Sequence, residues 1–139
     1  MRKQWIVFFC AAPGICSAAA IDIPMDRKLV MEALDSKTCY SRVKSRGQLL
    51  GYELVERLLV SSSGRLVELQ ATGAFGVGRR ETRRYIGHGI TVDIVPQRAM
   101  KYEDPEQDMT IVLEEGHAVV SERGRRQRLP VEVGEICTP

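Results

Sequence analysis

Apolar and polar residues alternate over the C-terminal part of the chain, which is the pattern of half-buried β-strands. Residues 109–114 alternate, Glu115-Gly116 is typical of a turn, and residues 117–121 alternate again, so this stretch predicts a hairpin. A second turn, at Arg123-Gly124, leads into a further strand over residues 127–133. The C-terminal region is therefore predicted to form an antiparallel meander.

The middle of the chain adds further strands. Residues 49–60 fit both periods, because leucines recur at helical spacing while the β-branched end and the polar loop that follows favour a strand. We interpret this segment as a strand, since residues 65–72 are a suitable hairpin partner. Residues 90–95 alternate as a strand that Pro96 is expected to end. Residues 101–108, rich in acids, are expected to form a solvated loop.

One segment near the start has helical spacing. Its apolar side recurs every three or four residues from Met25 to Leu34, and charged residues occupy the other side. A helix of about three turns is marginal in water, so it must pack on the sheet. The connections between the strands are too short for parallel crossovers. The pattern thus predicts an α+β fold, with an N-terminal helix packed on an antiparallel β-meander or small barrel of about six or seven strands.

The first 20 residues differ from this pattern. A positive head at Met1-Arg2-Lys3, an apolar run over residues 5–12 and small residues at 17–20 predict a cleaved secretory signal peptide, residues 1–20. The apolar run is too short for a hydrocarbon core that needs about 20 residues, so no stable membrane span is expected after cleavage. Residues 21–139 then form a single domain, which we expect to be periplasmic or secreted.

Cleavage changes both the cysteine count and the charge. Two of the four cysteines leave with the signal, so Cys39 and Cys137 are expected to form one disulfide in an oxidising compartment. Two basic residues leave as well, and the remaining 20 − 2 = 18 basic residues balance 18 acidic ones. A neutral domain gives no argument for binding to nucleic acid.

Residues suited to catalysis or metal binding are sparse. His88 and His117 are the only histidines and lack the ligand spacing of a metal site, so no metal or other cofactor is expected. The serines at 61–63 lie in no Gly-x-Ser-x-Gly elbow. The glycines at 73, 76 and 78 lack the ending of a phosphate loop and are expected to mark a bent or bulged strand. The sequence therefore favours a protein that is not an enzyme.

Arginine is concentrated in residues 79–84 and 123–128. Its planar guanidinium suits bidentate contact with carboxylates and phosphates. The first cluster supplies the predicted partner-binding residues: Arg79, Arg80, Arg83 and Arg84. On a strand these would alternate between two faces, and the acids of residues 103–108 are the alternative, internal partner that would make the cluster structural. Few aromatic residues lie nearby to stack bases, so single-stranded nucleic acid is not an expected partner.

Export, a disulfide and the lack of a catalytic constellation together predict a non-enzymatic binding module. It would act on an envelope or extracellular protein or polymer, as an inhibitor or an assembly accessory, and the arginines would suit an anionic partner. One alternative is a small-molecule carrier with an apolar cavity inside a curved sheet. Another is an unrecognised small hydrolase, which would require His88 or His117 beside an acid in a cleft.

In general plan the chain resembles small exported β-domains of bacteria that are held by one disulfide, among them the periplasmic lysozyme inhibitors. Those inhibitors carry serine-glycine and tyrosine-lysine motifs. Ser63-Gly64 is not followed shortly by a tyrosine here, so the resemblance assigns no role to individual residues.

Overall fold

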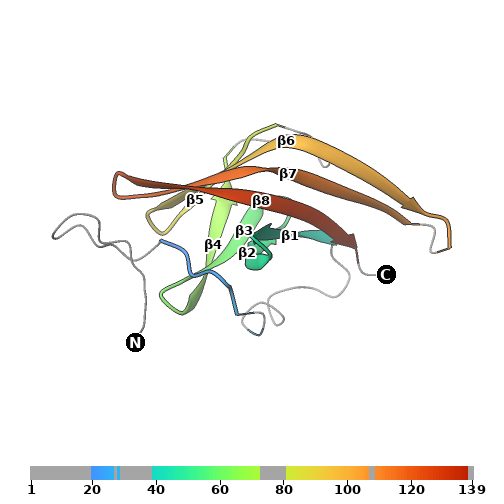
Figure 1. Ribbon diagram of the computed structural model, residues 1–139. Coiled ribbons are helices and arrows are strands. Elements are labelled where there is room, and N and C mark those ends of the chain that lie inside the picture. Colours follow the sequence, from blue (N-terminus) through green and yellow to red (C-terminus); the bar gives the residue numbers. More distant parts are fainter. Residues whose placement is uncertain (1–19, 27, 29–38, 73–80, 107–108, 138–139) are drawn as a thin grey trace, which may run out of the picture.

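The computed structural model describes residues 20–26, 28, 39–72, 81–106 and 109–137 (Figure 1). Eight strands form a closed antiparallel barrel in chain order, with the first strand paired to the last. The strands are β1 Cys39–Ser45, β2 Gln48–Glu53, β3 Arg57–Ser62, β4 Arg65–Ala71, β5 Arg83–Gly87, β6 Ile90–Asp104, β7 Met109–Glu122 and β8 Arg125–Cys137. The predicted antiparallel barrel is confirmed, with eight strands rather than six or seven, because residues 49–60 form two strands, β2 and β3.

The α+β prediction is wrong, since the described part of the chain is all-β and contains no helix element. Most of the expected helix, residues 29–38, lies outside the described residues. Met25, where it was expected to begin, instead packs against Tyr52 and Leu59, and its N–H donates to the Leu49 carbonyl at 2.7 Å. Met25, which fits the apolar side of a helix in the sequence, thus packs on the outside of β2 and β3.

Residues 20–25, here called the strap, lie across the hairpin between β3 and β4. The Asp22 carboxylate accepts hydrogen bonds from the Ser61 hydroxyl at 3.0 Å and from the Gly64 N–H at 2.7 Å. The Asp22 N–H donates to the Ser61 carbonyl at 2.7 Å, and the Ser62 hydroxyl donates to the Ala20 carbonyl at 2.8 Å. Ile21 is 2% exposed and joins the barrel core. These contacts make the strap part of the folded barrel.

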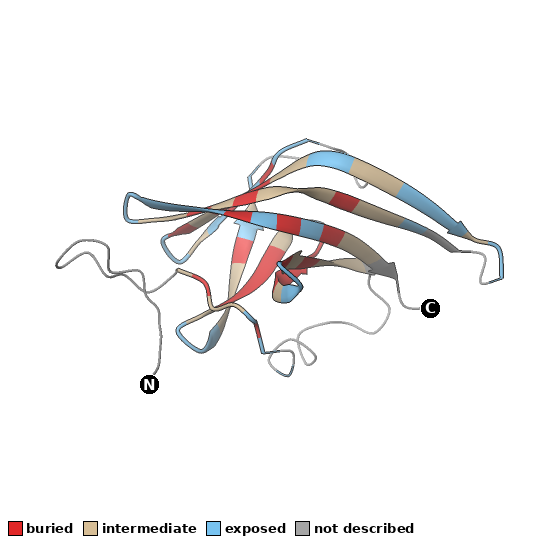
Figure 2. Ribbon diagram, viewed as in Figure 1, coloured by how far each residue is buried: buried red, intermediate tan, exposed pale blue. Residues whose placement is uncertain are grey.

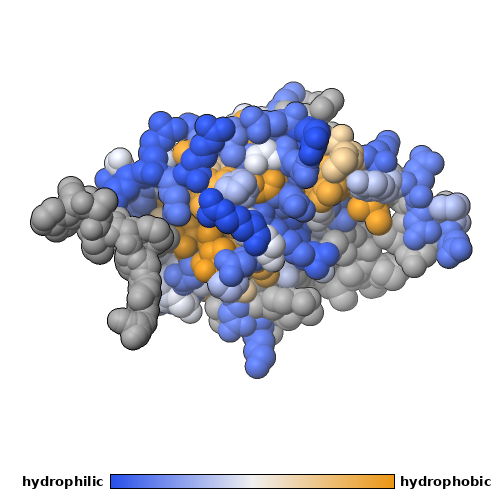
Figure 3. All heavy atoms as spheres, viewed as in Figure 1, coloured by the Kyte–Doolittle hydropathy of each residue, from blue (hydrophilic) through white to orange (hydrophobic). Residues whose placement is uncertain are grey.

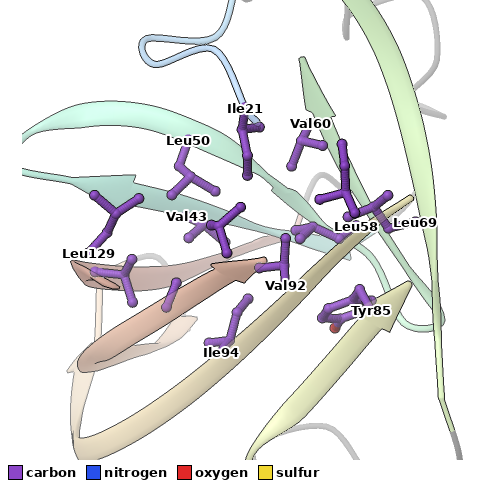
Figure 4. Close-up of a cluster of buried hydrophobic side chains, with 14 of the residues drawn as sticks. Ile21, Val43, Leu50, Leu58, Val60, Leu69, Tyr85, Val92, Ile94 and Leu129 are labelled. Carbon is purple, nitrogen blue, oxygen red and sulfur yellow. The ribbon is translucent and has the colours of Figure 1, made fainter. Parts of the chain in front are cut away.

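The barrel interior is packed with apolar side chains from every strand (Figures 2 and 4). One buried residue from each of β1 to β8 in turn is Val43, Leu50, Leu58, Leu69, Tyr85, Val92, Ala118 and Leu129. Inward and outward residues alternate along the strands, as a half-buried sheet requires. Burial of large apolar side chains, each contributing about 1.5–3 kcal/mol, stabilises the closed barrel.

Four tight hairpin turns join consecutive strands, and those between β3 and β4, β5 and β6, and β7 and β8 lie at one end of the barrel, here called the turn end (Figure 1). Each is a residue with positive φ followed by a glycine with positive φ: Arg46-Gly47, Ser63-Gly64, His88-Gly89 and Arg123-Gly124. Two successive positive φ angles are the requirement of type I′ turns, which match the twist of paired strands. The predicted turn at Arg123-Gly124 is confirmed.

Strands β6 and β7 are longer than predicted. Pro96, expected to end a strand, lies within β6 beside a bulge, and the predicted loop at residues 101–108 is strand up to Asp104. Gly116, expected in a turn, lies within β7 opposite Pro96. A Cβ at Gly116 would overlap the Val95 carbonyl oxygen. The glycine therefore permits a close approach of the two strands at the bulge, not a reversal of the chain.

Replacing Gly116 with alanine is expected to lower the free energy of unfolding by about 1–3 kcal/mol, because the bulged backbone of β6 must move away from the new methyl group. Gly134→Ala is the matched control, since a Cβ there would meet only a side-chain carbon of Leu113 at 3.6 Å. Urea unfolding of both variants measures the difference. Equal stability of the two would contradict the close approach.

The ladder between β1 and β8 closes the barrel and places Cys39 opposite Cys137. Directly opposed residues of an antiparallel ladder have Cα atoms about 4.5–5.5 Å apart, and disulfides span Cα distances of about 4.4–6.8 Å. The backbone register is compatible with the predicted bond, which stays a prediction. Residues 1–19 of the predicted signal peptide and the glycines at 73, 76 and 78 lie outside the described residues.

Candidate functional site

The predicted arginine cluster is divided by the structure. Arg79 and Arg80 lie outside the described residues. Arg83 points into the barrel and is 6% exposed, whereas Arg84 points outward and donates to Asp93 at 2.7 and 2.9 Å. The alternation of faces predicted for a strand is thus confirmed for the two described arginines, and only Arg84 of these two lies at the surface.

Arg83 is the centre of a buried ionic cluster that joins three strands. Its guanidinium donates to both carboxylate oxygens of Glu53 on β2, at 2.6 and 3.1 Å, and to Glu114 on β7 at 2.8 Å. The Tyr85 hydroxyl donates to Glu53 as well. All three charged side chains are at most 10% exposed. The cluster therefore ties β2, β5 and β7 together inside the barrel.

The surroundings fix the protonation of this cluster. Burial by itself would lower the pKa of Arg83, but the hydrogen bonds and charges of Glu53 and Glu114 outweigh it and raise that pKa above its usual range. Burial raises the pKa of Tyr85, and the Glu53 charge adds to the increase. Arg83 thus stays charged and Tyr85 stays protonated, so that both remain donors to the carboxylates.

The raised pKa of Tyr85 gives an expected pH dependence. An unfolded tyrosine ionises near pH 10 while the folded one keeps its proton, so stability is fully present below that pH and falls as the pH rises above it. The free energy of unfolding should drop by up to about 1.4 kcal/mol per pH unit from this residue. Denaturant unfolding of wild type and Tyr85→Phe between neutral and alkaline pH measures it. Parallel pH profiles for the two proteins would contradict the assignment.

A second feature is a group of unpaired arginines at the turn end. The group, here called the basic end, consists of Arg65, Arg123, Arg125 and Arg126, all exposed. Among the described residues none of them forms an ion pair. Some arginines elsewhere on the barrel do have acid partners, such as Arg57 with Glu68 at 2.8 Å and Arg84 with Asp93. Figure 3 shows strongly hydrophilic side chains over the end that carries the β7–β8 turn.

Two exposed acids lie at the opposite end of the long strands. Glu103 and Glu106 are at the tip of the β6–β7 hairpin, far along the strands from the β7–β8 turn (Figure 1). The domain predicted to remain after cleavage is neutral overall, so the basic end is a local concentration of positive charge and not the result of a net excess. Such a concentration attracts negative charge.

A third feature is a groove of about 600 Å³ on the outside of the barrel, here called the bend groove. One wall comes from Lys44 and Arg46, and the other from Gln97 and Arg98 at the β6 bulge. Gly116 and Pro130 also line it. The groove thus lies where the bulge and Gly116 bend the long strands.

Four charged residues cross the bend groove on adjacent strands. The register pairs Lys44 with Glu132, Glu132 with Glu115, and Glu115 with Arg98. The Arg98 Nε donates to Glu115 at 2.7 Å. In the described part of the chain neither Lys44 nor Glu132 forms an ion pair. Lys44 and Glu132 lie opposite each other on β1 and β8 without a direct ion pair, so the groove presents an ammonium and a carboxylate that a ligand can contact.

The two histidines lie on different parts of the barrel, His88 in the β5–β6 turn and His117 on β7. His88 is exposed in a turn, and the Nδ1 atom of His117 lies 3.3 Å from the Arg128 guanidinium. No hydrogen bond joins either histidine to a carboxylate within the described ranges. The same residues contain no group of three or more potential metal ligands.

Sequence reasoning did not identify the buried cluster or the bend groove. Glu114 and Glu115 point to opposite faces, as neighbouring residues of a strand do, since Glu114 binds Arg83 inside and Glu115 binds Arg98 outside. The sequence could have indicated the buried cluster through charged residues at inward-facing positions of the strands.

The chain matches no protein-family model, no curated protein and no solved structure in three comparisons. Within the described residues, no helix has the length and apolar character that a membrane crossing requires.

Proposed function

We propose that the protein is a non-enzymatic binding module whose basic end holds an anionic partner, an envelope or extracellular protein or polymer. The observation that carries this proposal is the lack of carboxylate partners for the four exposed arginines of the basic end among the described residues. Two arginines elsewhere on the barrel, Arg57 and Arg84, do have such partners.

The chemistry of the basic end suits acids on a partner. Guanidinium groups bind carboxylates and phosphates through two parallel hydrogen bonds, which are stronger than neutral ones. Arg123 lies in a type I′ turn, and Arg65 and Arg125 directly follow such turns, so rigid hairpins hold these groups. Little backbone ordering is then needed on binding, which favours affinity.

The two alternatives gain no support from the described residues. A carrier would need an apolar cavity, whereas apolar side chains from all eight strands meet in the barrel interior. A hydrolase would need His88 or His117 beside an acid, and neither has that neighbour within the described ranges. The arginines at the surface therefore favour binding over transport or catalysis.

The proposal is tested by replacing Arg125 and Arg126 with glutamine and measuring the affinity for a polyglutamate peptide by fluorescence anisotropy. Loss of two exposed ionic contacts, each contributing about 0.5–1 kcal/mol, should weaken binding roughly fivefold to thirtyfold. The melting temperature should change little, because both side chains are exposed.

The matched control replaces Arg57 and Arg84, which are already paired with acids, with glutamine. This control should bind the peptide as wild type does. Equal losses in the two double variants, or no loss in either, would reject the basic end as the binding surface.

A further inference from the structure

The bulge in β6 adds a backbone donor and acceptor to the bend groove. The register runs from Pro96 opposite Gly116 to Arg98 opposite Glu115, so Gln97 is the extra residue and has no partner in the β6–β7 ladder. Gln97 is exposed and lines the groove. The extra residue of a bulge leaves its backbone groups available for other hydrogen bonds. A ligand with a backbone of its own can use them.

The charges around the groove define what such a ligand carries. Adjacent strands lie about 4.8 Å apart, so Lys44, Glu132, Glu115 and Arg98 span about 14 Å across the groove. Like charges directly opposite each other are unfavourable, and this holds for Glu132 and Glu115. Arg98 neutralises only Glu115. Lys44 lies opposite Glu132 in the β1–β8 register, but no ion pair joins the two side chains, so Glu132 can still accept from an ammonium group, and an anion would suit Lys44 and Arg46.

We propose that the bend groove binds a short extended peptide that carries both a carboxylate and an ammonium group. The carboxylate lies against Lys44 and Arg46, the ammonium group lies against Glu132, and the peptide backbone bonds to Gln97. The volume of about 600 Å³ falls within the range of about 300–1,000 Å³ that is common for ligand sites.

This site is distinct from the basic end and goes beyond the proposed function. The basic end offers arginines and no exposed acid partner, so it selects for negative charge alone. The bend groove offers both signs, so it distinguishes a peptide of mixed charge from an acidic one. A variant that has lost one site should therefore still bind its probe at the other, and that binding can be measured.

The experiment compares three blocked tripeptides as probes: one with an aspartate and a lysine at its ends, one with two aspartates and one with two lysines. Titration calorimetry gives each affinity, and amide NMR shifts report where each probe binds. The mixed peptide should bind roughly fivefold more tightly than either of the others, with the largest shifts at Gln97 and Gly116.

Glu132→Gln should remove this preference, so that the mixed and the two-aspartate peptides bind equally. The Arg125→Gln and Arg126→Gln double variant is the control, and its preference should equal that of wild type. Polyglutamate binding should in turn be unchanged by Glu132→Gln, which separates this proposal from the function of the basic end.

Two results would overturn the proposal. One is tighter or equal binding of the two-aspartate peptide to wild type, because the groove would then be an extension of the basic end. The other is a lack of shifts at the groove with all three probes. The NMR measurement on wild type decides this second point even if a variant fails to fold.

Discussion

Arg83→Met is expected to lower the free energy of unfolding by about 3–5 kcal/mol. The substitution keeps an unbranched apolar stem but leaves Glu53 and Glu114 buried side by side without a counter-charge. An uncompensated buried charge costs far more than a lost surface contact, because the interior cannot solvate it. Urea unfolding at neutral pH measures the loss.

Two further variants show whether the buried charge is the cause. Combining Arg83→Met with Glu53→Gln and Glu114→Gln should recover most of the lost stability, since no charge remains inside. Arg84→Met removes the neighbouring arginine and its exposed contact with Asp93, and it should cost no more than about 1 kcal/mol. If Arg83→Met lowered the free energy of unfolding as little as Arg84→Met does, the cluster would not hold the barrel together.

Removing the predicted disulfide is expected to have a comparable effect, a loss of about 2–5 kcal/mol. Cys39 and Cys137 are opposed at the seam where β1 meets β8, and 137 − 39 = 98 residues separate them. A bond across so long a loop restricts the unfolded chain strongly. Replacing both cysteines with serine, or adding a reductant, should lower the melting temperature.

Thiol titration of the purified, denatured and unreduced protein gives an independent reading of the same bond. No free thiol should be found in the domain that begins after the signal peptide. The double serine variant serves as the control, because a reductant should leave its melting temperature unchanged. Two titratable thiols in the wild-type domain would show that the seam is held without a covalent link.

The antiparallel barrel could be predicted from the sequence because its signals are local. Alternation sets the strands, and an X-Gly pair with positive φ sets each tight turn, as at Arg123-Gly124. Signals that depend on a neighbouring strand were misread. Gly116 and Pro96 are typical turn and stop residues, yet they lie opposite each other and allow the long strands to bend. That pairing is visible only once the register is known.

The N-terminal helix was predicted wrongly for a related reason. The spacing of apolar residues from Met25 fits a helical stripe, but tertiary contacts decide how such residues are used. Ile21 enters the barrel core, and Met25 packs on the outside of β2 and β3. Asp22, between them, has its hydrogen bonds satisfied by the β3–β4 hairpin. The strap is therefore specified by the barrel surface.

The site could be predicted only in part, because sequence shows where arginines gather and not which of them find acids. Arg84 has Asp93 opposite it in the register and is paired. Arg126 has Ser121 opposite it, which offers no carboxylate. Arg125 has Glu122 opposite it and still forms no ion pair among the described residues. Both clusters look alike in sequence, and their difference arises from side-chain contacts that only the fold decides.

The claim that the basic end holds an anionic partner is tested most directly by the salt dependence of association. Stopped-flow rates with the polyglutamate peptide are measured at low ionic strength and at about 0.15 M, where the screening length is about 8 Å. Wild type should associate quickly at low salt and much more slowly at 0.15 M, whereas the Arg125→Gln and Arg126→Gln double variant should be slower at low salt and less sensitive to salt than wild type. Identical rates for the two proteins at both ionic strengths would contradict the account.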